Sequence, residues 1–193
     1  MPLTMSTSVA ELLKGETLYA HKKSERILTQ KLISIKSYQD YASILKMFYG
    51  YFHPIEAIVK KYLKKDVLKD IDERRNSLFI LHDLEAINYS TEEIPLCVDL
   101  PKINSSLEAL GTMYVLEGST LGGRVISKML MKNTSVVFGD ANLNFFNGYK
   151  VDTGSKWAHF LSVIDQYEKS AAIIVEAANE TFNCLTKWME RSL

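Results

Sequence analysis

The sequence has few cysteines and no long apolar run. Cys97 and Cys184 are the two cysteines among 193 residues, and two distant cysteines make neither a metal-binding pair nor a disulfide framework. We therefore expect two free thiols in a reducing compartment. The N-terminal residues have no apolar stretch behind a basic start, so no signal peptide is predicted. No apolar run approaches the roughly 20 residues of a membrane span. These absences predict a cytoplasmic protein.

An excess of charge of either sign is also lacking. Lys and Arg together number 23, as do Asp and Glu, so the formal net charge is zero. This balance argues against a general attraction to nucleic acid or to an anionic membrane. Apolar residues make up 47% and charged residues 24% of the chain, which is typical of a folded globular protein. The length and the even composition predict a single domain over residues 1–193.

Proline is scarce, strand signals are sparse, and apolar residues recur at helical spacing. Ser8 and Glu11 form a capping-box pattern at the start of the first helix. The one β-like run, residues 135–138, is too isolated to form a sheet. The sequence predicts an all-α fold of about seven helices. After the first helix, which carries His21, the expected helices are 38–51, 55–65, 72–88, about 105–132, 153–168 and 170–190, with a break at Pro54 and a loop over 88–104.

Glycines interrupt the most strongly helical stretch. Gly111, Gly118, Gly122 and Gly123 lie inside it, and each costs about 0.8–1 kcal/mol relative to alanine. Gly118 and Gly122 are four residues apart and share one face of the helix. This bare face would let a flat ligand approach the backbone and would let the helix kink. Close helix–helix packing, or a break into two shorter helices, are the alternative explanations. A phosphate-binding loop is disfavoured because neither nucleotide motif is present.

A histidine on the first helix is the candidate metal ligand. Thr17, His21 and Glu25 are spaced by four residues, so Glu25 can accept a hydrogen bond from one imidazole nitrogen and leave the other for a metal. Lys14 can project a cation towards the same region. One imidazole does not make a zinc site, but it suffices for a haem iron, because the macrocycle supplies four ligands. An ordinary solvated His–Glu pair is the alternative.

The remaining histidines and the paired arginines carry weaker signals. His53, His82 and His159 are interpreted as surface histidines or as histidines with ordinary partners. Arg74 and Arg75 are interpreted as part of a solvated face.

Two segments carry a family resemblance. Residues 13–25 read LKGETLYAHKKSE, and residues 109–126 read ALGTMYVLEGSTLGGRVI. With them the chain resembles the heme oxygenases, most closely the short bacterial type found with bacteriophytochromes. The second segment looks very like the distal-helix motif of that family and is the more specific of the two.

The resemblance implies a multi-helix bundle in which haem lies between the first helix and a kinked, glycine-rich helix. It implies cleavage of haem, as both substrate and cofactor, to biliverdin, CO and Fe²⁺. O₂ and an external electron donor, a reductase or a ferredoxin, are the implied partners. His21 would ligate the iron. Gly118, Ser119 and Gly122 would form the catalytic distal face, and Lys14, Thr17, Glu25, Tyr114, Gly123 and Phe182 would bind haem.

The chain departs from the family at positions that bear on regiospecificity. Ser119 stands where mammalian-type enzymes carry a distal aspartate. Ala158 and Ser162 stand where those enzymes carry a basic pair, which leaves Lys156 and Arg124 as candidate partners for the second propionate.

Two alternatives stay open at this point. One is a non-catalytic haem- or tetrapyrrole-binding protein on the same fold. The other is a different enzyme on the same helical architecture.

Overall fold

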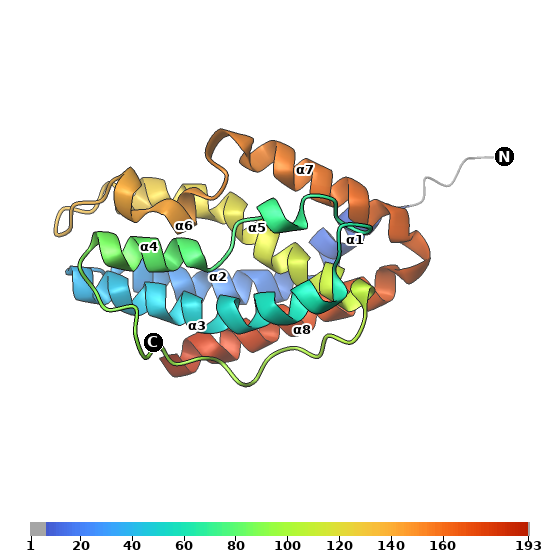
Figure 1. Ribbon diagram of the computed structural model, residues 1–193, viewed down its shortest axis with the longest axis horizontal. Coiled ribbons are helices and arrows are strands. Elements are labelled where there is room, and N and C mark those ends of the chain that lie inside the picture. The colour runs from blue at the N-terminus through green and yellow to red at the C-terminus, as the bar shows by residue number, and fades with distance from the viewer. Residues whose placement is uncertain (1–6, 193) are drawn as a thin grey trace.

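The computed structural model describes residues 7–192 and consists of helices joined by irregular segments (Figure 1). The helices are α1 (Val9–Glu16), α2 (Leu18–Ile33), α3 (Tyr38–Tyr62), α4 (Leu78–Ala86), α5 (Ser106–Leu130), α6 (Asn144–Asn147), α7 (Thr153–Ile164) and α8 (Ala171–Ser192). Four short 3₁₀ helices are η1 (Ile71–Glu73), η2 (Asp140–Asn142), η3 (Lys150–Asp152) and η4 (Asp165–Ser170). The all-α prediction is confirmed. Within residues 7–192, no helix has both the length and the apolar character needed to cross a bilayer.

The expected first helix is two helices. Ser8 caps α1 through the predicted capping box, in which its hydroxyl accepts from the Glu11 backbone N–H at 3.2 Å and the Glu11 carboxylate accepts in return. The helix then ends at Thr17, whose hydroxyl donates to the Leu13 carbonyl at 2.7 Å. The chain continues directly into α2, which carries His21.

The predicted break at Pro54 is wrong, because α3 is one continuous helix of 25 residues that includes this proline. A proline has no N–H to donate to the carbonyl four residues earlier, which here is that of Gly50. That carbonyl instead accepts a hydrogen bond from the Cys97 backbone N–H at 2.8 Å. The loop between α4 and α5, predicted from its prolines and polar residues, therefore satisfies the group that Pro54 leaves unpaired.

The segment 72–88 is also divided. It begins in η1 and becomes helical again only at Leu78, and Arg74–Ser77 lies between the two elements. The connection after α5 contains the unpredicted helix α6. Asp83 stabilises its start by accepting hydrogen bonds from the backbone N–H groups of Asn144 and Phe145 at 2.8 and 2.9 Å.

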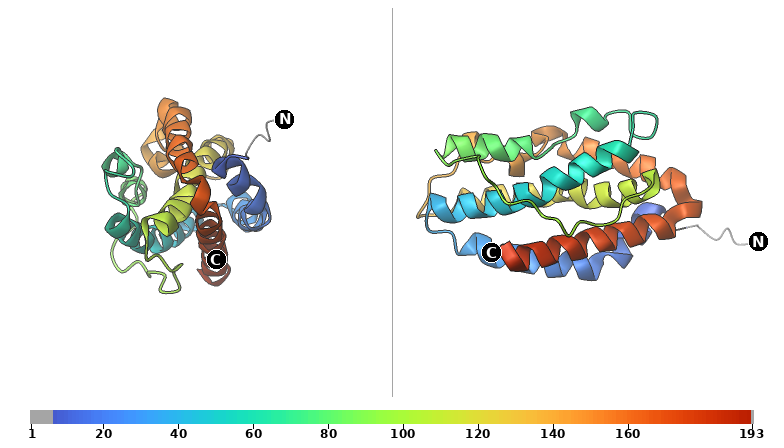
Figure 2. Two further views of the ribbon diagram at one scale, coloured as in Figure 1. Left: turned by 90° about the vertical axis from the view of Figure 1, so that its right-hand side faces the viewer. Right: turned by 60° about the horizontal axis from the view of Figure 1, so that its bottom comes forward.

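Helix α5 is continuous over 25 residues in spite of its glycines. It begins at the N-cap Ser105, whose hydroxyl accepts from the Glu108 backbone N–H at 3.3 Å. Its main neighbour is α8, and α2 and α1 pack against α8 as well (Figure 2). The interpretation of the glycines as a break between two shorter helices is therefore wrong.

Candidate functional site

The four glycines of α5 fall into two classes. A methyl group on Gly111 would overlap the backbone carbonyl oxygen of Ile174 in α8, and one on Gly123 would overlap that of Phe146 in α6. Both positions are buried. These two glycines are needed for close approach of the backbones, as the packing alternative proposed. Gly123, expected to bind haem, is thus placed on a face that packs against α6.

Gly118 and Gly122 have no such packing role. A methyl group on Gly122 would meet no atom within 4 Å. One on Gly118 would make only ordinary contacts, at 3.6 and 3.8 Å, with the side chain of Trp157. Each glycine costs about 0.8–1 kcal/mol of helix propensity, and no contact within residues 7–192 requires either of them. We call the surface over these two α-carbons the glycine face.

The His21 side chain is available to a ligand. It is exposed on α2, and its ring meets the ring of Phe182 edge-on with the centroids 5.5 Å apart. Phe182 itself is only 7% exposed, on α8. Among residues 7–192, no hydrogen bond involves the imidazole; the expected partner Glu25 is exposed and is not bonded to it.

A polar contact joins the helices that carry His21 and the glycine face. The side chain of Tyr114 in α5 lies near that of Thr17, the residue between α1 and α2. Burial raises the pKa of Tyr114, and the neighbouring Thr17 side chain opposes the increase. Helices α2 and α5 run in the same direction from this point (Figure 1). His21 lies one turn beyond Thr17, and Gly118 lies one turn beyond Tyr114.

Helix α8 supports both of these helices. The hydroxyls of Ser24 in α2 and Thr186 in α8 are 2.7 Å apart. Thr181, further back on α8, donates to the hydroxyl of Thr112 in α5 at 3.2 Å. Phe182 therefore lies between two anchored helices. An exposed imidazole beside an apolar ring, and a bare helix face, are features that a planar ligand with its own metal would need.

The hydroxyl of Ser119 is turned towards a buried arginine. It donates to the Leu116 carbonyl at 2.6 Å and accepts from Arg75 at 2.7 Å. Arg75 also donates to the Leu116 carbonyl at 2.8 Å, and its guanidinium lies 4.2 Å from the centroid of the Phe145 ring. Burial lowers the pKa of Arg75. The interpretation of Arg75 as a surface residue is therefore wrong, because its charged group is enclosed by aromatic rings and backbone carbonyls.

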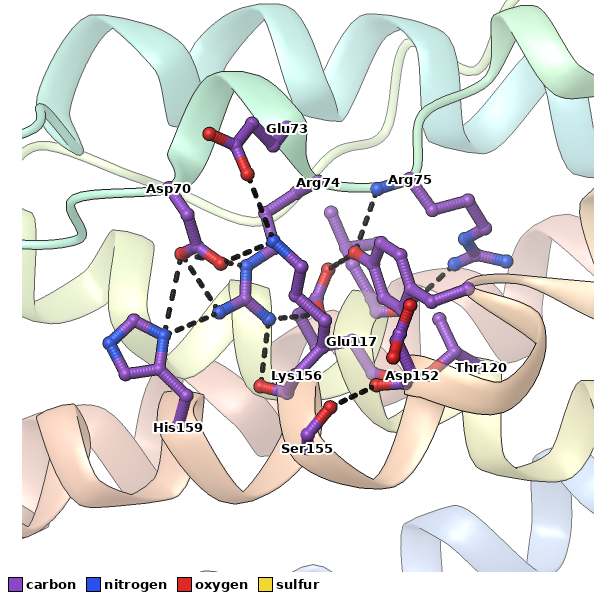
Figure 3. Close-up of polar contacts among 12 residues, drawn as sticks. Asp70, Glu73, Arg74, Arg75, Glu117, Thr120, Asp152, Ser155, Lys156 and His159 are labelled. Atoms are coloured by element: carbon purple, nitrogen blue, oxygen red, sulfur yellow. Dashed lines mark hydrogen bonds and ion pairs between the residues drawn. The ribbon is translucent and has the colours of Figure 1, made fainter.

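Arg74 is buried as well, in the ionic cluster shown in Figure 3. It is 2.6 Å from Glu117 in α5, and both side chains are only 2% exposed. It also pairs with Asp70 at 2.9 Å. The sequence analysis did not predict this cluster. A carboxylate within the apolar run of α5 was the available signal, since a buried carboxylate needs a cation.

The same cluster accounts for Lys156, an expected partner of the second propionate. Its ammonium group lies 2.8 Å from Asp70 and 3.2 Å from Glu73. Burial opposes ionisation of Asp70, but hydrogen bonds from Lys156 and Arg74 outweigh it and hold the pKa of Asp70 below its usual value. Lys156 is thus paired with carboxylates of the ionic cluster, whereas the other candidate partner of the propionate, Arg124, is exposed on α5.

The other histidines have separate environments. His53 is stacked on Tyr49 with the centroids 4.8 Å apart, and its Nδ1 is 3.3 Å from the Ser77 hydroxyl. His159 is 3.3 Å from Arg74 and joins the ionic cluster. His82 is exposed on α4. Across the described part of the chain, no three His, Cys, Asp or Glu side chains are grouped so that they could hold a metal ion.

Comparisons with known proteins identify a family and a shared fold. A family model described as heme oxygenase matches residues 7–191. The heme oxygenase of Xanthomonas campestris pv. campestris (strain 8004) is 38% identical over 78 residues; these are 40% of this chain and 45%, less than half, of that protein. The solved structure of the NO- and CO-bound heme oxygenase from Neisseria meningitidis matches with a TM-score of 0.77 at 18% identity. This match covers 97% of this chain and 92% of that one and shows a shared fold.

Proposed function

Because the chain belongs to the heme oxygenase family, we propose that it cleaves haem to biliverdin, CO and Fe²⁺, using O₂ and electrons from an external donor. One observation carries the proposal. The fold does not need the glycines at 118 and 122, yet it presents them one turn and two turns beyond the contact that joins α5 to the helix of His21. Haem is the substrate and also supplies the iron at which O₂ reacts.

His21 is the proposed iron ligand. One imidazole would be sufficient, because the macrocycle itself supplies four ligands to its iron. The ring of Phe182 lies edge-on to the imidazole. Glu25, one turn beyond His21, is the proposed acceptor for the second ring nitrogen, which would keep the ligand in one tautomer.

The glycine face is proposed to lie against the opposite side of the macrocycle. With no side chain at Gly118 or Gly122, the ring can lie directly on the α5 backbone. Ser119 has a positioning role in this proposal, because its hydroxyl is already bonded to Arg75 and to the Leu116 carbonyl. Arg75 thereby ties the turn of α5 that contains Gly118 to the segment between η1 and α4.

The remaining haem contacts are proposed at the rim. Lys14, exposed on α1, is the proposed partner of one propionate, and a solvated pair of this kind orients the substrate more than it adds affinity. Cys97 and Cys184 are free thiols, which fits a cytoplasmic location.

Replacement of the iron ligand tests the proposal. The ferric haem complex of the wild type should show the absorption and electron paramagnetic resonance spectra of imidazole-ligated haem. His21→Ala should lose them, and added imidazole should restore them. His82→Ala, at another exposed histidine, is the matched control and should leave the spectra unchanged. An imidazole-ligated spectrum in His21→Ala without added imidazole would contradict the assignment.

A further inference from the structure

The glycine face is closed at one end by an aromatic side chain. Trp157, on α7, points the benzo edge of its indole at Gly118. Its Cη2 and Cζ3 atoms lie 3.6 and 3.8 Å from the position that a methyl group on Gly118 would take. The next glycine along the face, Gly122, is exposed and meets nothing within 4 Å. The face is therefore open at Gly122 and bounded at Gly118.

The indole has little freedom to move away. Its ring centroid is 5.3 Å from that of Tyr114 in α5 and 6.0 Å from that of Phe160, one turn along α7. Tyr114 itself lies near Thr17. Aromatic contacts on two sides therefore define the position of the indole next to Gly118.

The backbone that carries Trp157 is anchored too. The preceding residue, Lys156, is tied through its ammonium group to Asp70 and Glu73, and its carbonyl accepts a hydrogen bond from Arg74 at 3.0 Å. In Figure 3, these contacts join α7 to the η1 segment. Because Arg74 is also bonded to Glu117 in α5, the ionic cluster links α7 to α5.

We propose that Trp157 is a substrate-contacting, specificity-determining residue, a wall that stops the macrocycle from sliding along α5 towards Tyr114. This inference rests on the proposed function. A planar ring laid over Gly122 and Gly118 must meet the indole edge, since that edge lies at van der Waals distance from the position of a methyl group on Gly118. Trp157 then determines how far the macrocycle extends along α5. It thereby determines which part of the macrocycle's edge lies over the glycine face.

The experiment compares Trp157→Ala and Trp157→Phe with Trp188→Phe. Trp188 is a matched control, because it is the other tryptophan and its indole N–H donates to the Met47 carbonyl in α3 at 2.8 Å. Zinc protoporphyrin and ferric haem without reductant are the probes, so no turnover is needed. The measurements are the dissociation constant, the circular dichroism of the Soret band and the NMR shifts of the haem methyl groups; biliverdin isomers are analysed separately.

We expect Trp157→Ala to change the Soret dichroism, the methyl shift pattern and the biliverdin isomer ratio. Its affinity should weaken by roughly two- to tenfold, the loss expected for one aromatic contact. Trp157→Phe should be intermediate, and Trp188→Phe should match the wild type. Far-ultraviolet dichroism of each unliganded variant verifies that it is folded.

Two results would overturn the inference, and they are distinguishable. If the wild type binds haem at His21 but Trp157→Ala keeps the wild-type dichroism, methyl shifts and isomer ratio, then Trp157 is not a wall of the site and the proposed function stands. If the wild type binds neither porphyrin, the proposed function is wrong, and this inference, which rests on it, is wrong as well.

Discussion

Neighbouring glycines in α5 should respond to the same substitution in opposite ways. Gly122→Ala places a methyl group where no atom lies within 4 Å. The unliganded protein should therefore gain most of the helix-propensity difference of about 0.8–1 kcal/mol. For a chain of this size that raises the unfolding midpoint by about 2–4 °C. Gly123→Ala drives the same methyl group into the carbonyl oxygen of Phe146 and should destabilise the protein by about 1–3 kcal/mol.

Haem binding should respond in the reverse sense at Gly122. If the macrocycle lies on the backbone there, an added methyl group holds it away from α5, and affinity should fall by roughly five- to a hundredfold. The assay is thermal unfolding of the unliganded variants, followed by titration with ferric haem at the Soret band. A Gly122→Ala variant that is less stable than the wild type, or that binds haem equally well, would refute the reasoning.

The ionic cluster supplies the other predictions. Glu117→Gln leaves the buried Arg74 without its nearest anion and should lower the free energy of unfolding by roughly 3–5 kcal/mol, measured by urea denaturation; Asp72→Asn, in an exposed pair, should leave the midpoint unchanged. The folded-state pKa of Asp70 is depressed below 3.8, so its ionised form stabilises the protein at neutral pH, and this stability is lost as the pH falls below about 4. Asp70→Asn should therefore flatten the decline of stability between about pH 4 and pH 2, and an unchanged decline would show that Asp70 is not held by its partners.

Local sequence signals predicted much of the fold. The capping box at Ser8, the full length of α5 and the loop between α4 and α5 follow from patterns within a few residues. The error at Pro54 has a non-local cause, because the carbonyl that proline leaves unpaired is satisfied by Cys97, more than forty residues later. No pattern in the sequence near Pro54 predicts that hydrogen-bond partner.

The candidate site shows the same division. The spacing of Gly118 and Gly122 on one face is readable from the sequence, but only the structure separates them from Gly111 and Gly123, where an added methyl group would overlap another backbone. The arginine pair was misread for a related reason. Arg74 looks like a surface residue until Glu117, from another helix, is seen to be buried against it.

A single-turnover reaction distinguishes cleavage of haem from binding alone. Ferric haem bound to the protein is supplied with O₂ and ascorbate in the presence of catalase, which removes free peroxide. We expect loss of the Soret band and release of CO and biliverdin in equal amounts, whereas His21→Ala should release neither. A Soret band that persists, or that bleaches without CO, would show that the protein binds haem without cleaving it.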